Sequence, residues 1–245
     1  MHLETTLSQL RDMHLSVMAD ALQRRLEQGD QHGLSGEEFA ALLIEDEYCA
    51  RQQRKLARLI AQANFKPEGA CLENVRYAAT RGVEKRDLMA FTTPAWIQGA
   101  HNLILTGATG TGKTYLAEAL GLQACKLGYS VKKLRYKTLF EELNAARGTG
   151  LFLKVMKRLQ LTRVLILDDF LMTPATLDDL ANLLEIIDER SQLGPVVITT
   201  QYPPSAWHPL LPDPTLADAL CDRLIHTSTI FHLQGDSQRK QNLSE

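Results

Sequence analysis

The sequence predicts an α/β fold with a five-stranded, mostly parallel sheet, preceded by a small all-helical domain. Two observations lead to this prediction. From residue 102 onward, five short apolar runs alternate with segments of helical periodicity, which is the pattern of strands joined by crossover helices. Before residue 67, helical periodicity dominates. We therefore expect a helical N-terminal domain over residues 1–66 and an α/β domain over residues 67–245.

Two amphipathic helices are expected in the N-terminal domain. The first covers residues 5–27, and its apolar residues recur at helical spacings: Leu7, Leu10, Met18, Leu22 and Leu26. The second begins at a capping-box pattern formed by Ser35 and Glu38 and runs to about Ala63. Residues 64–99 are irregular in pattern, and we interpret them as the connection to the α/β domain.

The α/β domain is expected to alternate strands and helices along its whole length. The strands are expected at residues 102–107, 129–136, 164–169, 196–201 and 229–233. The helices between them are expected at residues 113–127, 138–146, 151–160, 176–191 and 215–225. In such a fold, ligands bind at the carboxyl ends of the strands.

Composition limits the class of protein. The chain has 27 Lys and Arg against 29 Asp and Glu, a formal charge of −2, so any nucleic-acid surface must be local. The cysteines are far apart and form no C-x-x-C pair, which argues against a disulfide framework or a zinc site. Since there is no signal-peptide pattern and no apolar run of the roughly 20 residues that a membrane span needs, we expect a cytoplasmic protein without membrane contact.

The stretch "TGATGTGKT" matches the pattern G-x-x-x-x-G-K-[ST] directly after one expected strand and before an expected helix. The candidate phosphate-binding residues are Gly107, Ala108, Thr109, Gly110, Thr111, Gly112, Lys113 and Thr114. Glycines allow backbone N–H groups to converge on phosphate oxygens, Lys113 reaches the β and γ phosphates, and the Thr114 hydroxyl binds Mg²⁺. The alternative is a glycine-rich turn without a ligand, but the context favours a nucleoside triphosphate, ATP.

Two acids end the apolar strand "VLILDD". Asp168 is expected to hold the magnesium together with Thr114, as a Walker B acid does. Asp169 is then the candidate that orients or deprotonates the attacking water. A glutamate is more usual at this position, so the shorter aspartate leaves the rate of hydrolysis open. The alternative is that the two acids merely end a strand.

Two further candidates lie later in the chain. Thr200 and Gln201, at the end of "VVITTQ", are expected to sense the γ-phosphate. Their strand is expected to lie between the strand that precedes the glycine-rich motif and the strand that ends in Asp168. The alternative is an ordinary polar strand end. Arg223, on an otherwise apolar helix, is a candidate arginine finger for a neighbouring subunit's site. The alternative for Arg223 is a solvated charge or an ion pair within the chain.

Local basic clusters are the candidate DNA contacts. One cluster falls at i, i+3, i+4 and i+7 of an expected helix and consists of Arg51, Arg54, Lys55 and Arg58. A second lies at the end of the second expected strand and consists of Lys132, Lys133, Arg135 and Lys137. The alternative for the first cluster is a solvated helix face, or a contact to a neighbouring subunit.

The order of these motifs resembles the IstB-like helper ATPases of bacterial insertion-sequence transposons, which are AAA+ proteins akin to the DnaC-type helicase loaders. The resemblance covers nearly the whole chain, and "DPTLADALCDRLIH" is its most discriminating stretch. It implies an ATPase that oligomerises as a ring or spiral on double-stranded DNA and assists a separate transposase, with Arg223 as the finger. It also makes Arg239 a candidate second sensor and suggests that residues 70–100 close the adenine pocket.

Two other functions share these ATPase residues. A replicative helicase loader would differ in what its N-terminal helices bind. A DNA-binding scaffold would use ATP as a switch with negligible turnover, which the short side chain of Asp169 keeps open.

Overall fold

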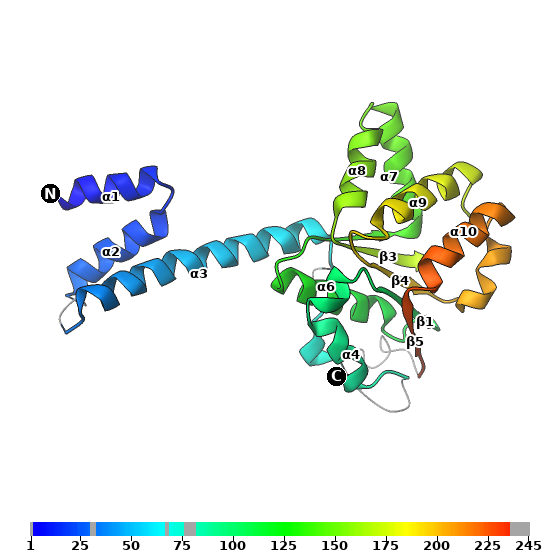
Figure 1. Ribbon diagram of the computed structural model, residues 1–245, viewed down its shortest axis with the longest axis horizontal. Helices are drawn as coiled ribbons and strands as arrows, with labels where there is room; N and C mark the ends of the chain where they lie inside the picture. Colours follow the sequence, from blue (N-terminus) through cyan, green and yellow to red (C-terminus); the bar gives the residue numbers. More distant parts are fainter. Residues whose placement is uncertain (1, 30–32, 67–68, 76–81, 236–245) are drawn as a thin grey trace. The chain divides into compact units, whose positions relative to one another are not determined.

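The computed structural model describes residues 2–29, 33–66, 69–75 and 82–235 (Figure 1). Its sheet has five strands in the order β2-β3-β4-β1-β5, and every neighbouring pair is parallel. The strands are β1 (Asn102–Gly107), β2 (Val131–Arg135), β3 (Val164–Phe170), β4 (Val196–Thr200) and β5 (Ser228–Leu233). The expected α/β class is confirmed, and the sheet is parallel throughout rather than mostly parallel.

The α-helices precede the sheet or connect its strands. They are α1 (Leu3–Asp12), α2 (Ser16–Gln28), α3 (Gly36–Ala63), α4 (Lys85–Met89), α5 (Ala95–Gln98), α6 (Lys113–Lys126), α7 (Tyr136–Gly148), α8 (Phe152–Leu161), α9 (Leu177–Arg190) and α10 (Pro214–Ile225). Short 3₁₀ turns are η1 (Leu72–Asn74), η3 (Ala90–Thr92), η4 (Pro204–Ala206) and η5 (His208–Leu210). Among the described residues, no helix combines the length and apolar character that crossing a membrane requires.

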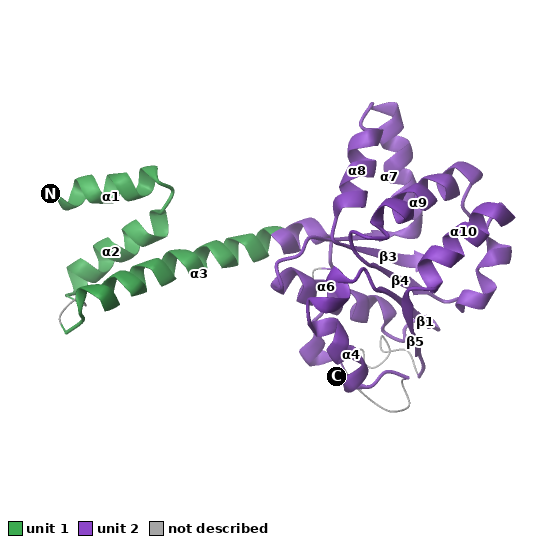
Figure 2. Cartoon of the chain, in the orientation of Figure 1, with its two compact units in different colours: residues 1–58 green, residues 59–245 purple. Residues whose placement is uncertain are grey.

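The chain forms two compact units, Met1–Arg58 and Leu59–Glu245, so the division falls inside α3 (Figure 2). Within the first unit, Leu7, Leu10 and Ala19 form a small buried cluster.

The single helix expected over residues 5–27 is two helices, because His14 has φ 60° and interrupts the helical backbone between α1 and α2. The expected capping box of α3 is confirmed: the Ser35 N–H donates to Glu38, and the Glu38 N–H donates to Ser35 Oγ.

Helices cover both faces of the sheet because the central strands are apolar on both sides. All six residues of β1 and all five of β4 are buried. Leu165 and Leu167 of β3 join the core cluster that contains residues of α7, α8, α9 and α10. Ile166, whose side chain alternates to the opposite face, contacts Gly121 of α6. The carboxyl ends of β1, β3 and β4 thus meet at one edge of a doubly covered sheet.

Candidate functional site

The glycine loop between β1 and α6 has a backbone that requires glycine. Gly107, Gly110 and Gly112 have φ values of 142°, 88° and 93°, which L side chains rarely adopt. At Gly107, a Cβ would lie 2.2 Å from the carbonyl oxygen of Leu233. The loop can therefore approach an anion closely. It leads into the amino end of α6, where the first N–H groups and the positive end of the helix dipole favour a bound anion.

The side chain of Lys113 lies within this loop. Its Nζ donates to the carbonyl oxygens of Gly107 and Ala108 at 2.8 Å each, and only 8% of the residue is exposed. Thr111 Oγ1 also donates to the Ala108 carbonyl, at 2.9 Å. The ammonium is held where the loop would receive phosphates, so a bound triphosphate would replace these carbonyls as its partner.

The two candidate magnesium ligands meet across the site. Thr114 Oγ1, in the first turn of α6, donates to Asp168 Oδ1 on β3 at 2.7 Å. Hydroxyl and carboxylate oxygens are the donors that Mg²⁺ prefers, and it usually keeps several waters beside one or two carboxylates and the phosphates of a nucleotide. The residues present therefore fit this ion.

Sequence reasoning missed Thr199, which also binds Asp168. Thr199 Oγ1 donates to Asp168 Oδ1 at 2.6 Å, whereas Thr200 Oγ1 donates to the Phe170 carbonyl at 2.9 Å. Successive residues of a strand point to opposite faces, so only one of two adjacent threonines can reach Asp168. Gln201 follows β4 and is exposed. β4 is expected from the sequence to lie between the strand that precedes the glycine loop and the strand that ends in Asp168. This placement is confirmed, since β4 lies between β1 and β3.

Asp169 lies on a bulge at the end of β3. The pairing with β4 shifts register between Leu167 and Phe170, and Asp169 has φ 57°. This backbone turns its carboxylate out of the sheet, where half of the side chain is exposed and Oδ2 lies 3.9 Å from Arg135 Nε. Its N–H donates to Thr199 Oγ1 at 3.1 Å. Thr199 therefore links both acids.

Comparison with known proteins identifies the family. The model of the IstB-like ATP binding proteins matches residues 8–245. The chain belongs to this family. It is 37% identical over 235 residues to the insertion sequence ATP-binding protein y4pL of Sinorhizobium fredii, covering 96% of each chain. It is 40% identical over 200 residues to the insertion sequence IS1162 ATP-binding protein of Pseudomonas fluorescens, covering 82% of this chain and 87% of that one.

Several solved structures share the fold of this IstB-like chain. DnaI aligns with a TM-score of 0.61 at 20% identity, covering 74% of this chain and 100% of that one. The DnaC helicase loader aligns with a TM-score of 0.56 at 19% identity, covering 69% and 98%. DnaA from Aquifex aeolicus bound to AMPPCP aligns with a TM-score of 0.61 at 18% identity, covering 74% and 56%. These likenesses show a shared fold, and the family to which the chain belongs is one of ATP-binding proteins.

Arg223 of this IstB-like protein lies far from its own glycine loop. Asn102 Nδ2, at the start of β1, donates to the Arg223 carbonyl at 3.1 Å, while the loop follows Gly107 at the other end of β1. At about 3.3 Å per residue, β1 separates the two by roughly 17 Å. The guanidinium contacts Asp188 of α9 and donates to the Ala219 carbonyl.

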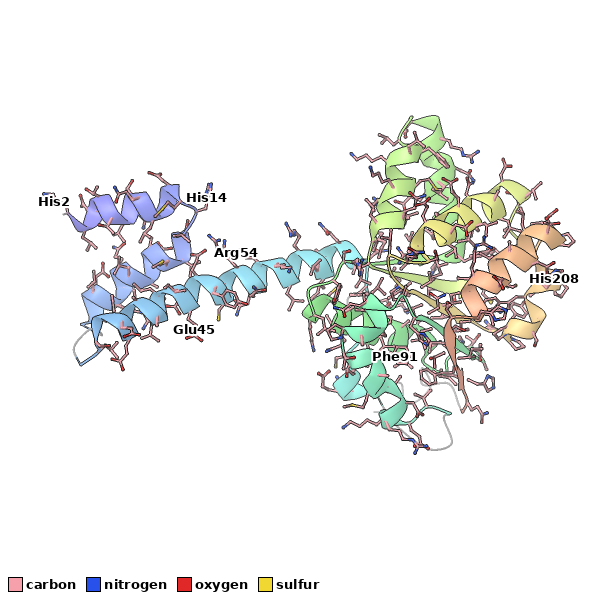
Figure 3. All side chains as sticks on the ribbon, in the orientation of Figure 1. His2, His14, Glu45, Arg54, Phe91 and His208 are labelled. Carbon is pink, nitrogen blue, oxygen red and sulfur yellow. The ribbon has the colours of Figure 1, made fainter. Side chains whose placement is uncertain are left out.

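The basic stripe of the IstB-like chain on α3 is exposed at all four positions, Arg51, Arg54, Lys55 and Arg58. Part of its charge is paired within the first unit, since Arg51 Nε lies 2.9 Å and Arg54 Nη2 lies 3.8 Å from Glu47 Oε1. Arg54 is among the side chains that extend from the ribbon in Figure 3.

The second basic cluster is less uniform than expected. Arg135 and Lys137 are exposed, and Lys132 is half-buried. Lys133 is buried, and its ammonium contacts Glu118 and Asp168. Because a buried, paired ammonium cannot reach a phosphate backbone, we remove Lys133 from the candidate DNA contacts.

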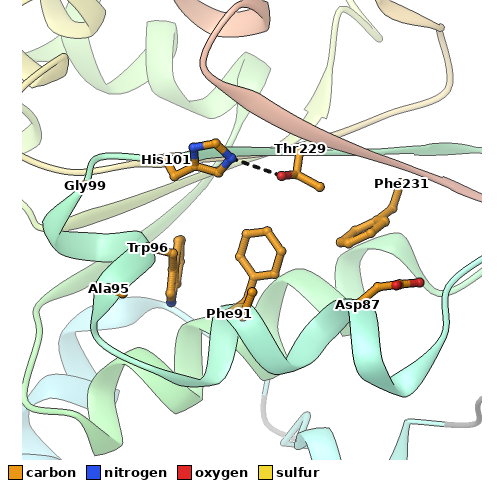
Figure 4. Close-up of a pocket in the computed structure, with 9 residues that line it drawn as sticks. Asp87, Phe91, Ala95, Trp96, Gly99, His101, Thr229 and Phe231 are labelled. Carbon is orange, nitrogen blue, oxygen red and sulfur yellow. Dashed lines mark hydrogen bonds between the residues drawn. The ribbon is translucent and has the colours of Figure 1, made fainter.

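An aromatic pocket of about 540 Å³ lies beside the edge strand β5 (Figure 4). Phe91 stacks edge-on against Trp96 and Phe231, and His101 bonds to Thr229 at 3.1 Å. His101 precedes β1, so the pocket reaches toward the amino ends of these strands and does not extend the glycine loop. Arg239, the candidate second sensor, lies outside the described residues, as does part of the segment expected to close the adenine pocket.

Proposed function

We propose that this IstB-like protein is a Mg²⁺-dependent ATPase that assembles as a homo-oligomer on double-stranded DNA in the cytoplasm and recruits or stimulates the transposase of its insertion sequence. The contact of Thr114 with Asp168 is the observation that supports ATPase activity. It brings the hydroxyl that follows the glycine loop and the Walker B carboxylate to one point. The names of the relatives, insertion sequence ATP-binding proteins, support the cellular context.

In this proposal the residues divide the work of phosphoryl transfer. Lys113 and the loop amides hold the β and γ phosphates, and Thr114 and Asp168 hold the metal, which when bound neutralises charge on the phosphates. Asp169 accepts a hydrogen bond from the attacking water and orients it, which its exposed carboxylate at the strand end allows. Gln201 is the candidate γ-phosphate sensor, while Thr199 fixes Asp168.

The trans role of Arg223 rests on its position. An arginine near the amino end of β1 cannot reach a phosphate held beyond its carboxyl end, so it serves either a neighbouring subunit's site or no site. We propose the first, which makes the oligomer a requirement for hydrolysis. The remaining basic residues, Arg51, Arg54, Lys55, Arg58, Lys132, Arg135 and Lys137, are the proposed DNA contacts.

A second candidate function is an ATP-switched DNA scaffold with negligible turnover. The observation that favours it is Asp169 itself, since an aspartate is one methylene shorter than the usual glutamate and also lies 3.9 Å from Arg135 Nε. A replicative helicase loader has less support, because the likeness to DnaI and DnaC is one of fold alone.

The experiment compares ATP-dependent assembly with ATP turnover. Sedimentation of the protein with double-stranded DNA should show large complexes with ATP and Mg²⁺, which Lys113→Ala abolishes. Asp169→Asn should retain these complexes and lose phosphate release, leaving longer-lived assemblies. Assembly without any phosphate release by the unmodified protein, with or without the transposase, would favour the scaffold. Failure to assemble on DNA under every nucleotide condition would exclude both.

A further inference from the structure

A buried lysine connects the candidate magnesium ligand to the helix of the glycine loop. The ammonium of Lys133, on β2, contacts Glu118 Oε1 on α6 and lies 3.4 Å from Asp168 Oδ2 on β3. Only 8% of the Lys133 side chain and 4% of the Glu118 side chain are exposed. Three elements that converge on the nucleotide site are therefore joined by one chain of charges.

The residues that follow α3 cover this pair. Asn64 Nδ2 donates to the Lys133 carbonyl at 3.3 Å, and the Lys66 N–H donates to Glu118 Oε2 at 3.4 Å. Between them, the Phe65 ring lies against Gly121 of α6, so closely that an added Cβ there would be 2.9 Å from it. The pair is thus almost inaccessible to solvent, and Glu118 has hydrogen-bond partners on both oxygens.

Stability alone does not explain why the Lys133–Glu118 ion pair is buried here. Two buried charges lose their hydration, and their attraction offsets this loss only when the geometry and hydrogen bonds are favourable; apolar side chains of similar volume often serve stability equally well. What apolar side chains could not provide is the contact of the ammonium with the second oxygen of Asp168.

We propose that Lys133 and Glu118 are positioning residues for Asp168. Lys133 holds Oδ2, and Oδ1 is thereby left facing the hydroxyls of Thr114 and Thr199. Glu118 balances the lysine, so that the carboxylate is oriented without a net positive charge beside the cation. This inference rests on the proposed binding of Mg²⁺ by Thr114 and Asp168.

The test measures how nucleotide affinity depends on Mg²⁺, with a fluorescent ATP analogue as the probe. The main variant is Lys133→Met with Glu118→Gln, which removes one charge of each sign and leaves the net charge near the metal unchanged. Partners that orient metal ligands typically change metal affinity by 10–100-fold, so we expect the Mg²⁺ concentration for half-maximal effect to rise about tenfold. Affinity in excess EDTA should stay unchanged, because the glycine loop is intact.

The matched control is Arg158→Met with Glu142→Gln, a partly exposed pair between α8 and α7 whose loss should leave the Mg²⁺ requirement unaltered. If the buried double variant does not fold by circular dichroism, Glu118→Gln alone replaces it; there Lys133 keeps its charge without its balance, and the Mg²⁺ requirement should rise several-fold. An unchanged requirement in a folded variant overturns the positioning role. Absence of any Mg²⁺ effect in the unmodified protein would instead overturn the proposed metal site, together with the inference built on it.

Discussion

Arg223 of α10 and Asp188 of α9 form an ion pair near the amino end of β1, whereas Lys113 lies beyond its carboxyl end. The pair is half-exposed, with 36% of the arginine side chain and 44% of the aspartate side chain accessible. An arginine that acts on a neighbour's ATP must leave this partner. The exposure makes the exchange inexpensive, since surface ion pairs contribute only about 0–1 kcal/mol.

Arg223→Ala should bind ATP nearly normally and lose hydrolysis by on the order of 10³, because an arginine supplied in trans stabilises transition-state charge. Asp188→Ala, the control, should keep hydrolysis and change the free energy of unfolding by less than about 1 kcal/mol. Phosphate release checks both variants. Mixing Arg223→Ala with Lys113→Ala should restore part of the activity, provided that the two still co-assemble. Full activity of Arg223→Ala as a monomer would contradict the trans role.

Gly107→Ala should weaken ATP binding tenfold or more and lower stability by about 1–3 kcal/mol from backbone strain alone. The cause is the φ of 142° together with the Leu233 carbonyl, 2.2 Å from the added Cβ. Gly148→Ala is the matched control, because nothing lies within 4 Å of its Cβ position at the end of α7. Nucleotide titration and urea unfolding would measure both. Equal behaviour of the two alanines would be evidence against the described loop.

Arg190→Met should lower the free energy of unfolding by about 3 kcal/mol or more, since buried acceptors that lose their donor stay without water. Arg190 is 1% exposed and donates to several backbone carbonyls, including those of Leu159 at 2.7 Å and Pro195 at 2.9 Å. Burial lowers its pKa to about 9, so it remains charged at neutral pH. Arg158→Met, which breaks an exposed pair with Glu142, should cost less than about 1 kcal/mol. Urea unfolding measures both variants. Equal losses in the free energy of unfolding would refute this role of Arg190.

Cys49 should react with iodoacetamide in the folded protein, and Cys125 should react only after unfolding. Cys49 is exposed, whereas burial raises the pKa of the Cys125 thiol to about 11. At pH 8 on the order of 10⁻³ of the Cys125 thiol is then the reactive thiolate, and this fraction grows as the pH rises toward 11. Mass spectrometry of the native protein, with and without urea, locates the label. Comparable native labelling of both cysteines would contradict the buried position on α6.

The parts of the site that sequence could predict are those encoded by neighbouring residues. Gly107 to Thr114 form one unbroken motif, and Asp168 ends an apolar run, so both could be placed from local pattern. Sequence reasoning misses Thr199 because its role depends on which of two adjacent threonines lies on the face of the sheet that carries the Asp168 carboxylate, and Thr200 is nearer the strand end.

Errors arose where tertiary contacts decide. The sequence groups Lys133 with its basic neighbours because charge alone does not tell which face of a strand a lysine occupies; its partner Glu118 is 15 residues away. The break at His14 was missed because the apolar spacing of the N-terminal residues continues across it. The bulge that turns Asp169 outward depends on the register between β3 and β4, which no single segment encodes.

The position in which Asn102 holds Arg223 limits how subunits can associate. Its amide ties the first residue of β1 to the Arg223 carbonyl and, through Oδ1, to the Val196 N–H at the start of β4, at 2.8 Å. If Arg223 acts in trans, each subunit offers its arginine from one edge of the sheet and receives another's at the opposite edge. Such a contact joins two different surfaces of the subunit. Repeated head to tail, it closes into a ring where the rotation between neighbours allows, or continues as a helical filament whose length the DNA sets.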